Sequence, residues 1–532
     1  MRSNSPLSNP ENKTEPQTEN QPVGAVFTPF KWATWVLEKY AILDRWLEGA
    51  TIFDPTAGEG IFLECLINLA VSQGISISST MLDRLYANEK NAEFIESFLS
   101  RMRSQYGINF PLSNFFNRDI LFFDRALTVD IVVGNPPWQN FANLTTAYKE
   151  LIKPLFHEYG LVHNSKDLLL GSSRIDLSSL IIIKTLQNHL RINGLAYFFM
   201  PLSVFLNDGA SRGFRAYGNK NLRFEVREIY DFKDDFKYEA IFEKIRTRYG
   251  LVCFQRDRQQ TFPIQYFQLS NSVKNSQNSA FEWQKCYARS LFKSDAPLSI
   301  SSDLQELQEL ENLHKIPVDL VSKPRQGINS CGAKDLFVFE DCQNISETLV
   351  RVSNRQFQNL ILPNQFLFPL VTKANFEQAH PIPQRYILIP YDITNGKPLS
   401  HAQLERHPQL WQYLLAHQTA LQNRKGTLIQ NWIKKGSWYA LLGVGIYTFM
   451  PYKVCWQAYG QKQFKAQLFE GHWQGNQALH AYMPMRERSL GENLVQQLNA
   501  PIVERYLRSQ QMEGTCNWAQ PGRILQLLEL VD

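Results

Sequence analysis

The chain has 532 residues, more than one ordinary globular core holds, so its length favours two or three domains. Hydrophobic residues make up 44% and aromatic residues 13%, a globular composition, and only residues 1–22, rich in Asn, Pro, Glu and Ser, are expected to form a disordered tail. The longest apolar stretches, Leu180–Ile183 and Tyr439–Met450, fall short of the roughly 18 to 20 residues of a membrane span, and the tail lacks the apolar core of a signal peptide. The composition therefore indicates a soluble, cytoplasmic protein.

Cysteine spacing and charge indicate which kinds of site and partner the protein has. The seven cysteines include no Cys-x-x-Cys pair, which argues against a zinc site or a disulfide framework, and we expect no metal. The net charge is +5, but residues 322–466 alone hold 16 Lys and Arg against seven Asp and Glu. Such a basic excess in the second half is expected of a surface that approaches phosphates, although an ordinary solvated surface could also carry it.

Between about residues 26 and 254, short apolar runs alternate with helix-length amphipathic segments, which is typical of β-α units around a parallel sheet. The predicted strands are Thr51–Phe53, Leu85–Asn88, Ile131–Gly134, Leu195–Met200, Arg227–Tyr230 and Gly250–Phe254. The predicted helices are Lys31–Tyr40, Ile61–Val71, Lys90–Arg103, Tyr148–Tyr159 and Leu177–Ile192, the last ended by Asn193-Gly194. We therefore expect an α/β fold built on a doubly wound, mostly parallel sheet.

After a polar stretch at Asn271–Asn278, the composition and the pattern of the sequence change. From about residue 290 onward, Trp, Tyr, Phe, Gln, Lys and Arg follow in irregular order with no repeat period. The predicted organisation is a tail at 1–22, a first domain at 23–270 and a second domain of mixed α+β structure at 290–532.

The first predicted strand runs into a short turn with two glycines, Asp54-Pro55-Thr56-Ala57-Gly58-Glu59-Gly60, and then into a helix. Gly58 and Gly60 let the backbone come close to a ligand at the carboxyl end of the strand, where doubly wound sheets bind nucleotides. The acidic Asp54 suits a positively charged ligand better than a pyrophosphate. S-adenosylmethionine, which carries a sulfonium and an ammonium group, fits this requirement.

Two further acidic residues follow at plausible strand ends. Glu89 ends the strand Leu85–Asn88 and could accept hydrogen bonds from both ribose hydroxyls of a cofactor, and Asp119 could hold its adenine amine. Taken singly, each acid is more often a turn or helix-cap residue. The ordered series of Asp54, Glu89 and Asp119 favours the cofactor interpretation.

The tetrapeptide Asn135-Pro136-Pro137-Trp138 follows the buried strand Ile131–Gly134 directly. Two consecutive prolines fix two φ angles and end the strand's ladder, so the Asn135 side chain and nearby carbonyls become preorganised acceptors. If Asn135 and the Pro136 carbonyl each accept one hydrogen of a planar amine, its lone pair faces a sulfonium methyl group. Trp138 offers a flat face for a base that has left the helix stack. The plainer alternative is a strand-ending turn over a packed aromatic ring.

With these motifs in this order, the sequence resembles the N6-adenine DNA methyltransferases in which the cofactor motif precedes the catalytic motif and a target-recognition domain follows both. The resemblance covers about residues 24–255. Thr28 and Pro29 look like the end of the family's opening motif, whose Thr lies near the carboxylate of the methionine moiety. Asp176-Leu177 and residues 194–201 look like its next two motifs. Phe242, with Phe236 as a nearby alternative, is similar to a second aromatic residue that packs on the flipped adenine, and Trp138 replaces the more frequent Tyr or Phe.

The resemblance implies a class I S-adenosylmethionine-dependent methyltransferase fold with a C-terminal recognition domain. It implies methyl transfer to the N6 amine of a flipped-out adenine in double-stranded DNA, within a restriction-modification or related defence system. Double-stranded DNA and a cognate restriction endonuclease are the implied partners, and we expect a monomer. The implied cofactor-binding residues are Thr28, Pro29, Asp54, Pro55, Ala57, Gly58, Gly60, Glu89, Asp119 and Asn135, and the implied catalytic residues are Asn135, Pro136, Pro137, Trp138 and Phe242.

The second half is most similar to recognition domains at Arg325–Asn329 and Trp438–Trp456. Lys and Arg contacts to phosphates would combine there with polar side chains that read base edges. The candidate DNA contacts are Arg325, Gly327, Arg424, Lys425, Lys434, Lys435 and Trp438. Two alternatives stay open, because an Asn-Pro-Pro-aromatic motif also occurs in methyltransferases of release-factor glutamine amides and of exocyclic RNA amines. A noncatalytic DNA-binding subunit is a third, although every motif is intact.

Overall fold

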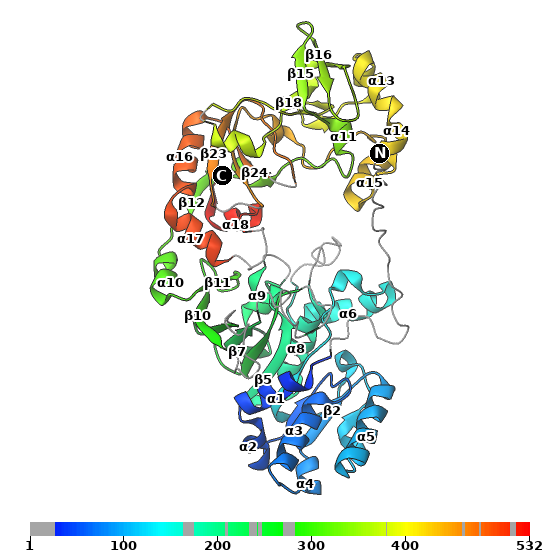
Figure 1. Cartoon of the computed structure of the whole chain (residues 1–532), viewed down its shortest axis with the longest axis vertical. Coiled ribbons are helices and arrows are strands. Elements are labelled where there is room, and N and C mark those ends of the chain that lie inside the picture. Colours follow the sequence, from blue (N-terminus) through cyan, green and yellow to red (C-terminus); the bar gives the residue numbers. More distant parts are fainter. Residues whose placement is uncertain are drawn as a thin grey trace, which may run out of the picture. The chain divides into compact units, whose positions relative to one another are not determined.

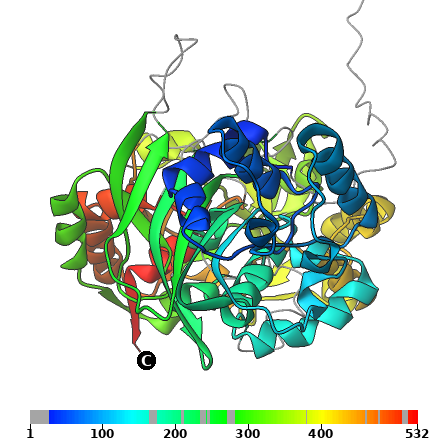
Figure 2. The ribbon, with the colours of Figure 1, turned by 90° about the horizontal axis from the view of Figure 1, so that it is seen from below.

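The computed structural model describes residues 27–162, 175–207, 211–232, 242, 247–269, 282–378, 380–459, 463–477, 480–510 and 518–531. The expected tail at 1–22 and the alternative Phe236 lie outside these residues. The chain divides into two compact units, Met1–Val204 with Ala210–Thr261 and Phe205–Gly209 with Phe262–Asp532. Both can be followed in Figure 1 and, turned by 90°, in Figure 2. Among the described helices, none is long and apolar enough to cross a membrane.

The first unit is built on a sheet with the strand order β3-β2-β1-β4-β5-β8-β7. Its strands are β1 Ile52–Asp54, β2 Leu85–Asn88, β3 Phe115–Phe116, β4 Val129–Gly134, β5 Leu190–Pro201, β7 Leu222–Asp231 and β8 Tyr249–Arg256, with β6 Gly218–Asn219 paired to β7. Pairing is parallel from β3 to β5, whereas β8 runs antiparallel to both β5 and β7. The predicted mixed α/β fold with a mostly parallel sheet is confirmed.

The strand order reverses between β1 and β4, which makes their carboxyl ends the switch point of the sheet. Ligands of open α/β sheets bind at this point, because the connections leave in opposite directions and open a crevice. Register pairs Phe53 with Val132, so the residues that follow β1 and those that follow β4 meet at the same edge. An added Cβ on Gly134 would lie 2.9 Å from Asp54 Oδ1, which shows how closely the two strand ends approach.

The helices around this sheet agree with the predicted ones, apart from their ends. They are α1 Phe30–Lys39, α2 Ile42–Leu47, α3 Ile61–Ser72, α4 Ser79–Leu82, α5 Ala92–Tyr106, α6 Thr146–Glu158, α8 Leu177–Asn188 and α9 Ser203–Leu206, with 3-10 turns η1 Leu112–Asn114, η2 Ile120–Phe122, η3 Phe141–Asn143 and η4 Phe214–Ala216. The prediction that α8 reaches Ile192 is wrong, because β5 begins at Leu190 and takes these residues into the sheet. Similarly, α5 starts after Asn91, whose side chain caps it by accepting from the Glu93 N–H.

The second unit consists of small, mostly antiparallel sheets and short helices. Its strands are β9 Ile264–Leu269, β10 Trp283–Ser290, β11 Leu298–Ser301, β12 Ile316–Asp319, β13 Arg325–Gln326, β14 Val338–Phe339, β15 Asp341–Asn344, β16 Leu349–Ser353, β17 Leu360–Pro363, β18 Leu367–Pro369, β19 Tyr386–Leu388, β20 Tyr391–Asp392, β21 Lys397–Pro398, β22 Tyr452–Gln457, β23 Ala466–Glu470, β24 His480–Met485 and β25 Leu528–Val531. Its helices are α10 Leu304–Glu311, α11 Lys334–Phe337, α12 His401–Glu405, α13 Pro408–Ala416, α14 Gln418–Gln422, α15 Thr427–Lys434, α16 Arg488–Leu498, α17 Pro501–Ser509 and α18 Pro521–Gln526, with 3-10 turns η7 Leu320–Ser322, η8 Asn364–Phe366, η9 Lys373–Glu377 and η10 Ile446–Phe449.

The four-stranded sheet β13-β24-β22-β23 is covered by α16, and β15-β16-β17 forms a separate meander. Strand β10 lies between residues 270 and 290, a segment that belongs to neither of the two predicted domains. The two-unit division falls shortly before residue 270. The mixed α+β character of the second half agrees with the expectation.

Candidate functional site

A cavity of about 780 Å³ opens at the switch point of the first unit. Its walls come from the ends of β1, β2 and β4, from the turn before α3 and from α6 and α8. Nine of the residues implied by the resemblance line it: Thr28, Asp54, Pro55, Ala57, Gly58, Glu89, Asp119, Asn135 and Pro137. Pro29, Gly60, Pro136, Trp138 and Phe242 are not among its lining residues. The motifs that lie far apart in the sequence are thus brought to one cavity.

The turn after β1 can be tight because residue 60 is a glycine. Gly60 has φ +78°, and an added Cβ would lie 2.3 Å from the Phe98 ring. The turn is tied to the neighbouring strand by the Ala57 N–H, which donates to the Asn88 carbonyl at 2.9 Å. No side chain larger than hydrogen fits at Gly60, so the backbone can approach the cavity and α3 can start directly behind it.

Asn88, at the end of β2, is a positioning residue that the sequence did not reveal. Its Nδ2 donates to the Pro55 carbonyl at 3.1 Å and to the Arg118 carbonyl at 3.0 Å, and the residue is 1% exposed. One buried amide thereby joins the loops that follow β1, β2 and β3. No local signal marks such a residue, because both acceptors lie about 30 residues away in the chain.

Asp54 lies at the floor of the cavity with 1% of its surface exposed. Its Oδ1 accepts from the Thr56 N–H at 3.2 Å. Burial raises the pKa of the Asp54 carboxyl well above its ordinary value, and the nearby charge of Glu89 raises it further. A positively charged ligand group in the cavity would offset this penalty, so the site favours a cation next to Asp54.

Glu89 is held by two backbone donors, one on each oxygen. The Gly58 N–H donates to Oε2 at 2.9 Å and the Asn91 N–H donates to Oε1 at 2.8 Å. Asn117 Nδ2 supports the same bend by donating to the carbonyls of Glu89 and Lys90, at 3.0 and 2.9 Å. Each carboxylate oxygen has a further lone pair, so Glu89 can accept from two hydroxyls of a ligand.

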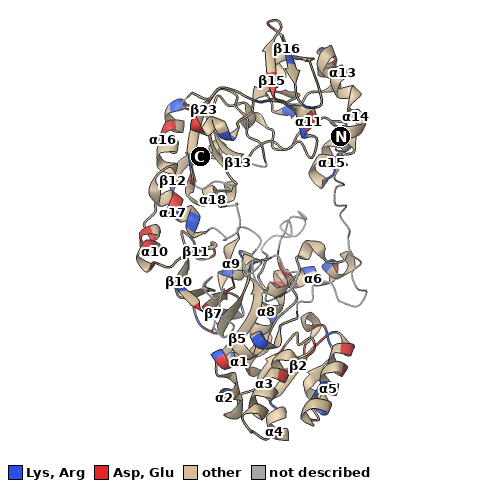
Figure 3. Ribbon diagram, viewed as in Figure 1, with Lys and Arg blue, Asp and Glu red and all other residues tan. Residues whose placement is uncertain are grey.

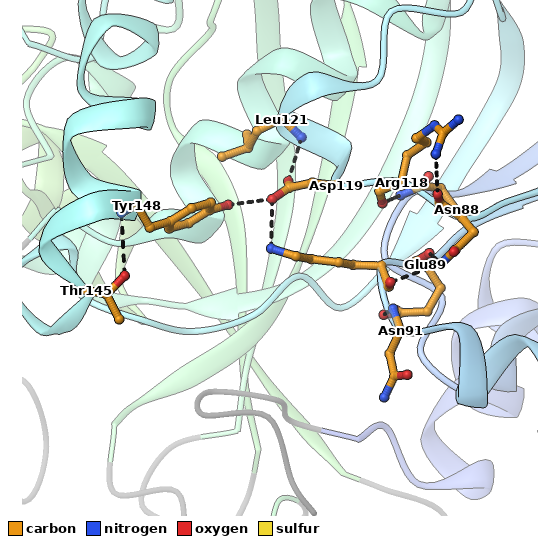
Figure 4. A network of polar contacts seen from close by, with 10 residues as sticks. Asn88, Glu89, Asn91, Arg118, Asp119, Leu121, Thr145 and Tyr148 are labelled. Atoms are coloured by element: carbon orange, nitrogen blue, oxygen red, sulfur yellow. Dashed lines mark hydrogen bonds and ion pairs between the residues drawn. The ribbon is translucent and has the colours of Figure 1, made fainter.

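Asp119 belongs to a polar network that Figure 4 shows from close by. Its Oδ1 accepts from the Leu121 N–H at 3.1 Å and so caps η2. Its Oδ2 accepts from the Tyr148 hydroxyl at 2.9 Å and pairs with Lys90 Nζ at 3.1 Å. Tyr148 was expected only as the first residue of a helix, and its part in this site was missed because Asp119 precedes it by 29 residues.

Asn135 and Thr28 connect the tetrapeptide to the opening motif. Asn135 Nδ2 donates to Thr28 Oγ1 at 3.1 Å, and Thr28 is buried. This bond fixes which way the amide faces, because the nitrogen points to Thr28 and the oxygen points elsewhere. The acceptor role that the sequence predicts for the Asn135 oxygen stays a prediction.

The loop after the tetrapeptide is anchored to the start of α8. The Leu177 N–H donates to the Gln139 carbonyl and the Phe141 N–H donates to the Ile175 carbonyl, both at 2.8 Å. Asp176 caps α8 by accepting from the Ser178 N–H at 2.9 Å. The Asp176-Leu177 motif therefore holds the loop that follows Trp138, and Leu177 and Ile181 of α8 line the cavity.

Trp138 and Phe242, for which the sequence predicts a shared role, are in contact. Their ring centroids are 5.0 Å apart at an interplanar angle of 75°, and the Tyr249 ring lies 5.2 Å from Trp138 at 33°. Phe242 is 2% exposed. Because the rings of Trp138 and Phe242 are in direct contact, a base can enter between them only if they separate. Tyr249, on β8, is a third aromatic residue of this cluster that the sequence did not single out.

Three candidate DNA contacts of the second unit lie inside the fold. Arg424 is 5% exposed, and its guanidinium donates to the carbonyls of Leu421, Ser330, Ala440 and Trp438 at 2.6–3.1 Å. Trp438, 4% exposed, packs against Trp411 and Tyr439. Gly327 is buried where an added Cβ would lie 2.3 Å from the Gly475 carbonyl oxygen. Burial gives these three residues structural roles, which corrects the prediction that they contact DNA.

The remaining candidates face solvent at least in part. Lys425, Lys434 and Lys435 are exposed before and at the end of α15. Arg325, on β13, is half-buried and stacks on the Tyr447 ring, 3.5 Å from its centroid. Figure 3 shows how Lys and Arg are spread over the elements of this unit. The three exposed lysine side chains can reach an external anion.

No protein-family model matches the chain. The chain is similar to the Type II methyltransferase M.NspV of Nostoc sp. (strain ATCC 29411 / PCC 7524), with 24% identity over 437 residues, which are 80% of this chain and 79% of that protein. Because each unit is shorter than the match, the similarity reaches both units.

Among solved structures, the chain is similar to the Type IIL restriction-modification enzyme MmeI, determined in complex with DNA, with a TM-score of 0.50 and 12% identity. That match covers 88% of this chain and 62% of MmeI. A modification subunit of a putative type I restriction enzyme from Vibrio vulnificus YJ016 matches with a TM-score of 0.33 and 17% identity over 47% of this chain and 48% of that one. The chain thus spans about half to three fifths of these structures, and the MmeI likeness concerns the fold alone.

Proposed function

We propose that this protein is a DNA methyltransferase of a restriction-modification system, which uses S-adenosylmethionine to methylate the N6 amine of adenine in double-stranded DNA. The observation that carries the proposal is the single cavity in which Asp54, Glu89, Asp119 and Asn135 meet. Similarity to M.NspV over both units supports the reaction class, and the fold shared with MmeI supports DNA as the substrate.

The donor set of the cavity fits the cofactor. The buried carboxyl group of Asp54 suits the ammonium of the methionine moiety, and Glu89 has lone pairs for the two ribose hydroxyls. Asp119 can accept from the adenine amine, while Ile120, Leu177 and Ile181 supply apolar walls. When bound, S-adenosylmethionine supplies a methyl group on a positively charged sulfur.

Asn135 and Pro136 activate the target by orientation. An exocyclic adenine amine is a poor nucleophile because its lone pair is delocalised into the ring. If the Asn135 oxygen and the Pro136 carbonyl each accept one amine hydrogen, the nitrogen lone pair points toward the methyl group, and the positive charge that develops on nitrogen is stabilised. Bound S-adenosylmethionine would supply the methyl group and leave as S-adenosylhomocysteine. The Asn135 and Pro136 oxygens would orient the amine, whose proton would go to water.

The test compares the wild type with Asn135→Ala and with Asn143→Ala. Asn143 is exposed in η3, close in sequence to the tetrapeptide, and so controls for the loss of an amide. We expect labelled methyl transfer to duplex DNA to fall about a hundredfold or more in Asn135→Ala, because one preorganised contact to the developing charge is lost. Cofactor affinity, measured by calorimetry, should change little, and Asn143→Ala should behave as the wild type. Full transfer by Asn135→Ala would contradict the mechanism.

The substrate is tested separately by base-modification sequencing of DNA from cells that express the protein. The proposal requires N6-methyladenine at a defined sequence. The alternative substrates, a release-factor glutamine amide and an exocyclic RNA amine, predict labelled protein or RNA and unmodified DNA. A second unit with 16 Lys and Arg against seven Asp and Glu in residues 322–466 favours DNA, because these other substrates do not require it.

A further inference from the structure

Among the residues that line the cofactor cavity but belong to none of the motifs is Tyr148, which carries a hydroxyl group. Tyr148 is the third residue of α6, and its N–H donates to Thr145 Oγ1 at 3.4 Å in the cap of that helix. The side chain is half-buried and lines the cavity. Its hydroxyl donates to Asp119 Oδ2 at 2.9 Å. Figure 4 shows the ring directed from the helix toward Asp119.

Two donors of the protein framework therefore fix the plane of the Asp119 carboxylate. The Leu121 N–H binds Oδ1, and the Tyr148 hydroxyl binds Oδ2. Each donor belongs to a different element, η2 and α6, so rotation of the carboxylate would break at least one of the two bonds. The lone pairs that remain point in defined directions.

Lys90 also contacts this carboxylate, but it is a different kind of partner. Its side chain is 68% exposed, against 17% for that of Asp119, and its ammonium lies 4.9 Å from the centre of the Tyr148 ring. An exposed lysine has many rotamers and contributes little energy in such a pair. Tyr148, which is anchored in a helix, is the partner that sets the geometry.

The hydroxyl of Tyr148 can act only as a donor to this carboxylate. Burial, followed by the charge of Asp119, raises the pKa of Tyr148 above its ordinary value of 10.0. The phenol therefore keeps its proton throughout the physiological pH range, and the ionised carboxylate offers only acceptors.

We infer that Tyr148 is a positioning residue of the cofactor site, which aims the carboxylate of Asp119 at the 6-amino group of the adenine ring. This inference rests on the proposed function. It extends that function by naming a residue outside the motifs, Tyr148, that makes the site select an aminopurine. A carboxylate whose plane is fixed accepts well from one direction, so the site distinguishes a purine with the 6-amino group from one without it.

The experiment measures the affinity of two ligands by calorimetry. One is S-adenosylhomocysteine, and the other is its deamino analogue, in which hydrogen replaces the 6-amino group. We expect the wild type to prefer the first by about tenfold, because a hydrogen bond to a charged acceptor is lost with the second. In Tyr148→Phe the preference should fall to about threefold or less through weaker binding of S-adenosylhomocysteine, with the deamino analogue bound as before.

Tyr159→Phe is the matched control. Tyr159 ends the same helix, and its hydroxyl accepts from Asn188 at 3.1 Å, outside the residues that line the cavity. It should keep the wild-type preference. In an Asp119→Asn background, Tyr148→Phe should have no further effect on the preference, because Tyr148 acts through Asp119. With DNA as substrate, Tyr148→Phe should raise KM for S-adenosylmethionine and leave kcat unchanged.

The results distinguish a failure of the proposed function from a failure of the positioning role of Tyr148. If the wild type binds neither ligand, the proposed function itself fails. If the wild type binds and discriminates but Tyr148→Phe keeps the full preference, or weakens both ligands equally, the positioning role is refuted and the proposed function stands.

Discussion

The buried carboxyl group of Asp54, which we propose to bind a positively charged group of the cofactor, lowers the stability of the fold where it is ionised. Burial raises its pKa well above the value of 3.8 of a free side chain, with a further contribution from Glu89. Because the folded-state pKa is the higher one, the carboxyl group stabilises the fold only where it is protonated. The penalty begins above the ordinary pKa and grows until pH passes the raised folded-state value.

We predict that Asp54→Asn raises the melting temperature and weakens binding of S-adenosylmethionine. The amide keeps the shape and can still accept from Thr56, but it carries no buried charge and cannot offset a ligand cation. Thermal unfolding should show a larger gain at pH 8 than at pH 5, since the wild-type carboxyl group is more protonated at the lower pH. Asp83→Asn, an exposed matched change, should shift neither property. A lower melting temperature for Asp54→Asn at pH 8 would contradict this account.

Gly60, in the turn after β1, and Gly74, which follows α3, permit a test of packing. Both have positive φ, +78° and +76°, but an added Cβ meets the Phe98 ring at 2.3 Å in one and nothing within 4 Å in the other. Gly74→Ala should cost about 1–2 kcal/mol of unfolding free energy from backbone strain alone. Gly60→Ala should cost about 1–3 kcal/mol more from overpacking, as urea denaturation would show. Equal costs would mean that Phe98 yields freely.

Helix α8 links the loop after Trp138 to the sheet. Its first turn is capped by Asp176, and the Leu177 N–H holds the Gln139 carbonyl of the loop after Trp138. We predict that Asp176→Ala lowers stability by about 1 kcal/mol through loss of the cap and also lowers kcat, because the anchor of the loop loosens. Asp176→Asn keeps a good cap and should retain most stability and activity. If the alanine variant lost stability with kcat intact, the cap would not position the loop.

Elements of the first unit could be predicted because their signals are local. The Asp54 turn, the Gly-bearing start of α3 and the Asn135 tetrapeptide each lie next to an apolar run that the structure shows as a strand or a helix. Asn88 and Tyr148 could not be predicted, because their partners lie about 30 residues away and only folding brings them near. The end of α8 was misplaced because a glycine signal at Asn193-Gly194 belongs to β5 rather than to a helix end.

Contacts between residues distant in the sequence also explain why Arg424 and Trp438 were predicted to contact DNA although both are buried. A sequence shows that Arg424 is basic and Trp438 aromatic, but not that four backbone carbonyls surround the guanidinium or that Trp411 covers the indole. Where a sequence lacks regular periodicity, it does not show which arginines are exposed and which are buried. Here burial, rather than residue type, decides which basic residues can meet a phosphate.

We expect DNA binding to depend on salt through the exposed lysines of the second unit. Each phosphate contact releases counterions and contributes about 0.9 to the slope of log affinity against log salt concentration. We predict that the triple change Lys425→Gln, Lys434→Gln, Lys435→Gln in the full-length chain weakens binding to duplex DNA at low salt and flattens this slope by about 1–3 units. Fluorescence anisotropy with a labelled duplex measures both.

The control removes the same charge from another part of the chain. Lys39, Lys220 and Lys285 are exposed in α1, after β6 and in β10, and their triple change to Gln should leave the slope nearly as in the wild type. A slope flattened equally by both triple variants would mean that the overall charge, and not the surface around α15, attracts the duplex. If only the α15 variant changes, the exposed lysines carry the phosphate contacts that buried Arg424 cannot make.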